Sequence, residues 1–200
     1  MGSGKWEVKT GTAFPISRFP LPKRLTSALL LLLAASCGPD GLSKEWERVE
    51  PPAPAADFSL QALDGSTVSL SSQKGRIVLL EFWATWCGPC RFSTPSLDVI
   101  YRKYKDRGVS VLLVNHGEEA DVIRKWAKTR FVAPILLDPQ KQVTFLYQAD
   151  ALPKLFVIDQ QGRIVYVHEG YGGGLEASLK LILDEMLAPP GDAPVKAAGT

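Results

Sequence analysis

The chain is poor in cysteine and histidine, and it has no apolar run long enough to cross a bilayer. Three cysteines and two histidines stand among 200 residues, and the odd cysteine count leaves one thiol over if the other two pair. The longest fully apolar part of the N-terminal segment, residues 28–35, is far short of the roughly 20 residues that a spanning helix needs. Neither a collagen-like nor a low-complexity bias is present. These features favour one globular domain with tails, or at most two small domains.

Basic residues are not in excess outside the N-terminal segment. Residues 1–36 contain five Lys or Arg and one Glu, so the 23 basic and 21 acidic residues of the whole chain leave 18 and 20 for the remainder. A nucleic-acid-binding protein normally gathers positive charge on one face or along one helix. We therefore expect no nucleic-acid partner.

The N-terminal segment resembles a secretory signal of the lipoprotein type. Lys23 and Arg24 precede the apolar stretch, and small residues lead directly into Cys37. A positive flank, a short apolar core and small residues at the boundary are typical of an export signal. We expect residues 1–36 to be this signal, with a long positively charged region, and Cys37 to be lipidated as the first residue of the mature chain. An uncleaved anchor and a plain signal peptide with a stray cysteine are the alternatives to lipidation. The 22 residues before Lys23 are long for such a region, so either translation starts downstream of Met1 or this segment is a cytoplasmic extension.

The remainder divides into a tether, a domain and a tail. Residues 37–54 are polar and then rich in proline, which predicts a semi-extended tether with Trp46 exposed. The folded domain is expected to span residues 55–188. Residues 189–200 follow the last helical pattern and begin with two prolines, so a disordered tail is expected there.

Apolar patterns within the domain predict strands that alternate with helices. A turn at 63–66 between two short strands predicts a hairpin. The uninterrupted run 77–83 predicts a central strand covered on both faces, and apolar residues at helical spacing follow Cys90. Further strands are expected at 109–114, 135–137, 155–158 and 164–167, the last two as a hairpin, and further helices at 122–130, 143–147 and 175–186. This order indicates an α/β fold with a mixed sheet.

Two cysteines lie where the central strand passes into a helix, in the sequence Cys87-Gly88-Pro89-Cys90. Unpaired N–H groups and the dipole at a helix N-terminus lower the pKa of a thiol, which makes it a nucleophile near neutral pH. The second cysteine, three residues further on, is placed to close a disulfide. The pattern therefore indicates thiol–disulfide exchange, with a static structural disulfide and a metal site as alternatives.

Glu81 interrupts the apolar run 77–83. A carboxylate inside a buried strand is costly to ionise, so its pKa is expected to rise towards neutrality. An edge position, with the carboxylate in solvent, is the alternative.

Several motifs together carry a family resemblance. They are Trp83-Ala84-Thr85-Trp86-Cys87-Gly88-Pro89-Cys90, Pro95, Leu152-Pro153 before a late strand, Asp57-Phe58-Ser59-Leu60 at the front, and the Asp159 turn with Gly162-Arg163-Ile164-Val165 at the end. This set resembles the thioredoxin superfamily, and most closely its membrane-anchored, extracytoplasmic TlpA/ResA-like branch. The resemblance implies a thioredoxin-like fold over about residues 55–187, in which helices flank a central mixed β-sheet, with an N-terminal hairpin and an inserted helix and strand.

The resemblance also implies a role for single residues. Cys87 is expected to be the exposed attacking thiol and Cys90 the shielded resolving thiol. Glu81 is expected to help take the proton from the resolving thiol, and Pro153 to be a cis-proline packed against the disulfide. Contacts with substrate are implied for Trp86, Gly88, Pro89 and Leu152. Ser93 departs from the branch, whose members often carry an acid at this position, three residues after the second cysteine.

The activity implied is that of an extracytoplasmic thiol–disulfide oxidoreductase that reduces protein disulfides. The redox-active disulfide is the only cofactor expected, with no metal. The expected substrates are disulfides of other proteins, for example proteins of cytochrome c maturation or other envelope proteins. The other expected partners are a membrane-embedded thiol donor and the membrane itself, through a lipid anchor. The Gly88-Pro89 dipeptide is associated with reducing potentials, so we predict a reductant, and a monomer.

A copper-binding module is the alternative function. It would use the cysteine pair and one histidine, His116 or His168, although related copper proteins space their cysteines by three residues and not two. His116 follows a strand end and is expected in a solvated loop, whereas His168 fits a strand. A metal site would need about three ligands with a settled second shell.

Overall fold

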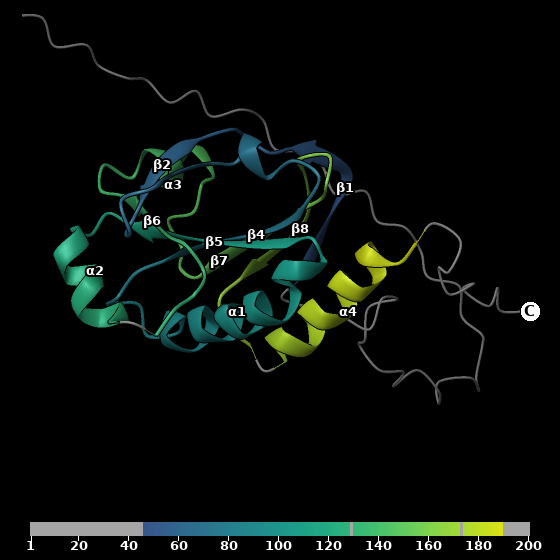
Figure 1. The fold of residues 1–200 in the computed structure, drawn as a ribbon. Coiled ribbons are helices and arrows are strands. Elements are labelled where there is room, and N and C mark those ends of the chain that lie inside the picture. The colour runs from purple at the N-terminus through teal and green to yellow at the C-terminus, as the bar shows by residue number, and fades with distance from the viewer. Residues whose placement is uncertain (1–45, 129, 173, 190–200) are drawn as a thin grey trace, which may run out of the picture. The chain divides into compact units, whose positions relative to one another are not determined.

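The computed structural model describes residues 46–128, 130–172 and 174–189 (Figure 1). Its strands are β1 (Trp46–Pro54), β2 (Ser59–Ala62), β3 (Thr67–Ser69), β4 (Ile77–Trp83), β5 (Val109–His116), β6 (Ile135–Asp138), β7 (Lys154–Ile158) and β8 (Arg163–Glu169). Its helices are α1 (Cys90–Tyr104), α2 (Ala120–Ala127), α3 (Gln142–Leu146) and α4 (Leu175–Leu187), with short 3-10 turns at Ser71–Gln73 and Lys105–Arg107. None of these helices is long and apolar enough to cross a membrane.

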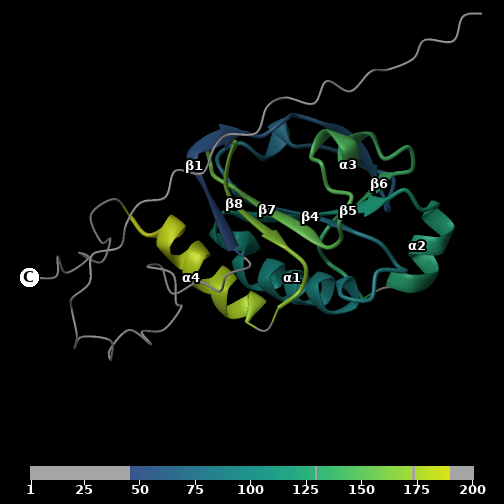
Figure 2. The same ribbon diagram turned by 180° about the vertical axis from the view of Figure 1, so that it is seen from behind.

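The strands form one mixed sheet in the order β1-β8-β7-β4-β5-β6-β2-β3. Strand β4 lies in its interior, parallel to β5 and antiparallel to β7, and all seven of its residues are buried. Figures 1 and 2 show α1 and α4 together on one face of the sheet and α3 on the opposite face. A strand covered on both faces has no need of alternating polar residues, which explains the continuous apolar run.

Alternate residues of β4 belong to the two halves of the core. Ile77, Leu79 and Trp83 pack with the buried faces of α1 and α4, whereas Val78, Leu80 and Phe82 pack with α3 and with the hairpin of β2 and β3. Successive side chains of a strand point to opposite faces of the sheet. The mixed sheet, the N-terminal hairpin and the inserted α2 and β6 were all expected from the sequence and are confirmed.

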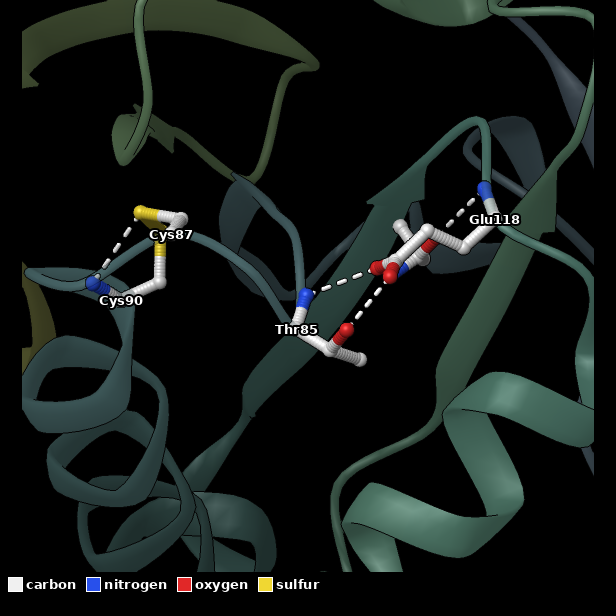
Figure 3. Close-up of a disulfide and its surroundings, with 5 residues drawn as sticks. Thr85, Cys87, Cys90 and Glu118 are labelled. Atoms are coloured by element: carbon white, nitrogen blue, oxygen red, sulfur yellow. Dashed lines mark hydrogen bonds between the residues drawn. A yellow bond between two sulfur atoms is a disulfide. The ribbon is translucent and has the colours of Figure 1, made fainter.

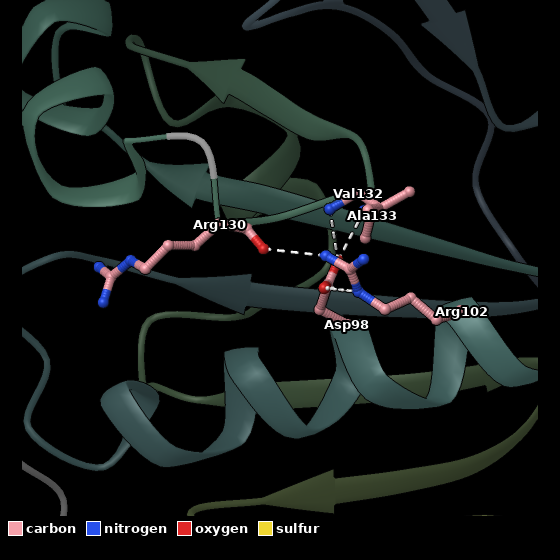
Figure 4. Close-up of polar contacts among 5 residues, drawn as sticks. All are labelled: Asp98, Arg102, Arg130, Val132 and Ala133. Atoms are coloured by element: carbon pink, nitrogen blue, oxygen red, sulfur yellow. Dashed lines mark hydrogen bonds and ion pairs between the residues drawn. The ribbon is translucent and has the colours of Figure 1, made fainter.

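Helix α1 is fixed to the rest of the domain by a buried carboxylate (Figure 4). Asp98 accepts hydrogen bonds from the backbone N–H groups of Val132 (2.7 Å) and Ala133 (2.8 Å), just before β6, and from Arg102 Nε (2.8 Å). Arg102 also donates to the carbonyl of Arg130 (3.0 Å). Because charge-assisted bonds to a buried carboxylate are among the stronger polar contacts in proteins, this cluster holds α1 against the segment that leads into β6.

The tether predicted for residues 37–54 is wrong where the structure describes it. Residues 46–54 form β1, which pairs antiparallel with β8, and the domain therefore begins at least nine residues before the predicted boundary at 55. Trp46, predicted to be exposed, is 9% exposed and packs against Tyr166 and His168. Proline cannot donate to a sheet but is tolerated in an edge strand, which is why a proline-rich sequence forms one here.

Two smaller predictions are also corrected. Helix α2 ends at Ala127, so Arg130 is outside it and lies over the rings of Trp126 and Phe131. Strand β5 continues to His116, which is 8% exposed and not a solvated loop residue. The predicted signal 1–36, Cys37, the rest of the tether and residues 190–200 of the predicted tail lie outside the described residues.

Candidate active site at the end of strand β4

The chain passes from the buried strand β4 to helix α1 through a short turn that holds a disulfide. Cys87 and Cys90 are bonded to each other, and Cys90 is the first residue of α1. The backbone N–H of Cys90 donates to Cys87 Sγ at 3.2 Å (Figure 3). The sulfur of Cys87 therefore sits against the N-terminus of a fifteen-residue helix, where N–H groups and the helix dipole stabilise negative charge.

The two cysteines differ little in exposure in this oxidised form. Cys90 is fully buried, as expected for a resolving thiol, but Cys87 is only 4% exposed. The expectation of an exposed Cys87 is therefore wrong for the disulfide form. The physical reason is that the disulfide and the Cys90 N–H hold Cys87 Sγ against the first turn of α1.

Glu81 lies in the middle of the site's supporting strand. It stands opposite Leu113 of β5 and Leu155 of β7 and is 1% exposed, which excludes the alternative of an edge position. Burial raises the pKa of its carboxyl from 4.5 to about 7, because a low-dielectric surrounding disfavours the charged form. The predicted rise towards neutrality is confirmed.

The carboxyl of Glu81 is incompletely paired. The hydroxyls of Ser93 and Thr94, in the first turns of α1, lie close enough to it to oppose the rise in its pKa. Within the part of the chain that the structure describes, however, neither hydroxyl makes a hydrogen bond of ordinary geometry, and Glu81 Oε2, Ser93 Oγ and Thr94 Oγ1 are all buried without a partner. A group of under-satisfied polar atoms just beyond Cys90 is costly, and such groups are more common at functional sites than elsewhere.

Pro153 approaches the site from the neighbouring strand. The Leu152–Pro153 peptide bond is cis, as the resemblance implied, and Pro153 is buried. Lys154, the first residue of β7, stands opposite Phe82 of β4, so Pro153 lies at the edge of the sheet where β4 ends. The carbonyl of Pro153 accepts a hydrogen bond from the N–H of Gly170 at 2.9 Å, which ties it to the turn after β8.

The residues expected to contact substrate surround the disulfide and are accessible. Trp86 is 65% exposed, Gly88 and Pro89 are exposed, and Leu152 is half-buried. The rings of Trp86 and His116 form a T-shaped pair with centroids 6.1 Å apart. Trp83, three residues before Trp86, is by contrast fully buried.

Three residues near the disulfide were not singled out from the sequence. Phe92 and Tyr171 are 62% and 41% exposed and stack on each other, with ring centroids 5.6 Å apart. Glu118 accepts hydrogen bonds from the backbone N–H and the hydroxyl of Thr85 (Figure 3). A signal for Glu118 was available: it follows a buried strand that runs parallel to β4, and such strands end at the same edge of the sheet.

The described residues offer no ligand set for the copper-binding alternative. Among them, no group of three or more His, Cys, Asp or Glu side chains is gathered closely enough to hold a metal ion. His116 and His168 thus do not join the cysteine pair in such a group.

Known proteins are similar to this chain in sequence and in fold. The Redoxin family matches residues 49–180, more than half of the chain. The thiol-disulfide oxidoreductase ResA of Geobacillus kaustophilus is 36% identical over 151 residues, which cover 73% of this chain and 86% of that protein. Proteins of solved structure are also similar to this chain.

Two solved structures illustrate the match. A thiol:disulfide interchange protein of the thioredoxin family from Chlorobium tepidum has a TM-score of 0.60 at 28% identity, covering 68% of this chain and 97% of that one. The pneumococcal exposed lipoprotein thioredoxin Etrx1 from Streptococcus pneumoniae has a TM-score of 0.56 at 32% identity, covering 64% and 99%. The chain therefore belongs to the Redoxin family and is a TlpA/ResA-like thiol–disulfide oxidoreductase of the thioredoxin superfamily.

Proposed function

We propose that the Cys87–Cys90 pair reduces disulfides of other proteins outside the cytoplasm. The observation that carries this proposal is the disulfide at the start of α1, where the Cys90 N–H donates to Cys87 Sγ. A static disulfide needs no helix N-terminus beside one of its sulfurs and no carboxyl with a raised pKa nearby. The pair itself carries the electrons, so no further cofactor is required.

The reaction begins with the reduced form. The Cys87 thiolate attacks one sulfur of a substrate disulfide, a Cys87–substrate disulfide forms, and the other substrate sulfur leaves as a thiolate that takes up a proton. Cys90 then gives its proton to the Glu81 carboxylate and attacks Cys87 Sγ. The mixed disulfide breaks, the second substrate sulfur leaves and is protonated, and Cys87–Cys90 is again a disulfide. Two electrons have passed to the substrate.

Glu81 suits the second step because its pKa is about 7. A base works best when its pKa lies near the working pH, since it is then both available and strong enough to accept a proton. Cys90 is fully buried and has little access to solvent water as an acceptor. Pro153, beside the same end of β4, would limit how substrate backbone approaches the sulfurs.

Exposed apolar side chains around the disulfide support a protein as the substrate. Trp86, Phe92 and Tyr171 present aromatic surface that a small soluble thiol compound does not need. Gly88, Pro89 and Leu152 would complete the contact with the substrate chain. Exposed apolar patches of this kind are typical of interaction sites.

The location and the electron supply are part of the same proposal. The signal-like residues 1–36 and the small residues before Cys37 support export and lipidation, and the name of the pneumococcal homologue describes an exposed lipoprotein. A monomer anchored by its lipid on the outer side of the membrane would be recharged by a dithiol of a membrane-embedded donor. Its clients would include proteins of cytochrome c maturation.

The two cysteines should behave differently when replaced. Cys87→Ser removes the attacking sulfur, so reduction of insulin disulfides should be lost. Cys90→Ser leaves the first step intact but prevents resolution, so mixed disulfides with client proteins should accumulate and be visible on non-reducing gels. Full insulin reductase activity in Cys87→Ser would refute the proposed function.

Glu81→Gln should stabilise the oxidised protein in a pH-dependent way. Between about pH 4.5 and 7 the folded state keeps a proton that the unfolded chain has released, so the wild-type protein loses stability as the pH rises. For a pKa shift of this size, the free energy of unfolding falls by about 3 kcal/mol above pH 7, and the Glu81→Gln variant, which has no carboxyl to ionise, avoids this loss. Urea unfolding should therefore give Gln an advantage at pH 8 that is absent at pH 4. An equal difference at both pH values would contradict the raised pKa.

Cys37→Ala should release the protein from the membrane. If the thiol of Cys37 carries the lipid, the variant incorporates no labelled fatty acid and is extracted by sodium carbonate, whereas the wild-type protein is labelled and resists extraction. Membrane retention of an unlabelled Cys37→Ala protein would instead indicate an uncleaved anchor.

A further inference from the structure

The carboxylate of Glu118 joins the end of β5 to the turn that carries the disulfide. Its Oε2 accepts from the backbone N–H of Thr85 at 2.7 Å, and its Oε1 accepts from the Thr85 hydroxyl (Figure 3). Thr85 stands two residues before Cys87. Cys87 itself donates from its N–H to the carbonyl of Ala84 (3.2 Å), but this hydrogen bond lies within the turn. Glu118 therefore ties this turn to a separate strand.

Glu118 is itself held in place by Asn115. The fully buried Asn115 donates from Nδ2 to Glu118 Oε2 at 2.8 Å, and its Oδ1 accepts from the Glu118 N–H at 3.1 Å. Asn115 stands opposite Trp83, the last residue of β4, in the parallel pair of strands. The carboxylate thus has a fixed position relative to the end of β4 before it meets Thr85, as a preorganised support requires.

We propose that Glu118 is a positioning residue for thiol–disulfide exchange. The Glu118–Thr85 contact holds residues 84–87 so that Cys87 Sγ remains against the Cys90 N–H. That hydrogen bond stabilises the thiolate, and the same placement orients the sulfur for attack. Among the described residues, Glu118 bonds to Thr85 and Asn115 and to neither sulfur, so it acts on Cys87 through Thr85. This role rests on the proposed function of Cys87 as the attacking thiol.

Substitution by glutamine separates position from charge. The amide oxygen can take the place of Oε2 and accept from both N–H donors, and the amide nitrogen can donate to the Thr85 hydroxyl, which accepts as well as it donates. Glu118→Gln therefore keeps the contact and removes the charge, whereas Glu118→Ala removes both. Thr85→Ala removes only the hydroxyl bond, and Thr85→Ser keeps both bonds, so this second pair tests the same contact if Glu118→Ala does not fold.

Asp98→Asn is the matched control. Like Glu118, Asp98 is a carboxylate that accepts three hydrogen bonds, here from two backbone N–H groups and Arg102, but it acts on α1 and the segment before β6 (Figure 4). The Asp98→Asn variant should have a lower urea midpoint of unfolding than the wild-type protein but the same insulin reductase activity. Any effect of Glu118→Ala that Asp98→Asn reproduces at equal loss of stability is merely structural.

The experiment measures insulin reduction and the pH midpoint of Cys87 alkylation by iodoacetamide in the reduced proteins. Glu118→Ala should lower kcat/KM roughly tenfold, by misplacing the sulfur, and move the alkylation midpoint to higher pH, because the thiolate loses its fixed N–H donor. Glu118→Gln should restore kcat/KM to within about twofold of wild type, since the contact remains.

Several results would overturn the inference. If Glu118→Ala moves the midpoint to lower pH, and Glu118→Gln does the same, Glu118 acts through its charge and not through position. If neither Glu118→Ala nor Thr85→Ala changes activity while Cys87→Ser is inactive, the inference fails and the proposed function stands. An active Cys87→Ser would instead remove the proposed function itself.

Discussion

The hydrogen bond from the Cys90 N–H to Cys87 Sγ is the contact on which the rest of this site depends. It exists because a fully buried strand ends a few residues before a helix begins, so that one sulfur meets the unpaired N–H groups of the first turn. A thiolate at this place is stabilised before any substrate arrives. The surrounding structure therefore serves mainly to keep the turn between β4 and α1 in one geometry.

Each side of that turn has its own support. Glu118 holds Thr85 from the end of β5, and Pro153 lies at the same edge of the sheet, just before β7. Residues next to two different strands thus lie at the edge of the sheet where β4 ends. Sites built on rigid strands and helices keep their geometry better than sites built on loops alone, and this arrangement leaves the sulfurs little freedom.

The buried carboxyl of Glu81 lowers the stability of the folded domain. A buried carboxyl with a pKa of about 7 and an unpartnered oxygen destabilises the folded state at neutral pH. The expected loss, about 3 kcal/mol, is a large part of the 5–15 kcal/mol by which domains are usually stable. An apolar residue at this point of β4 would serve the core better, and the cost is consistent with the proposed role of the carboxyl as acceptor of the Cys90 proton.

The sequence predicts those parts of this account that depend on local pattern. The continuous apolar run 77–83 predicts a buried strand, and the helical spacing after Cys90 predicts a helix. A carboxylate inside such a run predicts a raised pKa. Strand β1 was missed because proline-rich segments resemble tethers, and only pairing with β8 makes residues 46–54 a strand. His116 was placed in a loop because Asn115-His116-Gly117 has the composition of a turn. Glu118 was missed because its contact with Thr85, 33 positions away, is visible only in the folded chain, although its place after a strand parallel to β4 was a signal for it.

The reduction potential of the Cys87–Cys90 couple tests the central claim most directly. It is measured by equilibrating the purified protein with glutathione buffers of known ratio and quantifying the free thiols. A protein that passes electrons to client disulfides should have a potential near that of thioredoxin, about −270 mV. A potential near about −120 mV, typical of a disulfide donor, would contradict the account and mean that electrons flow the other way.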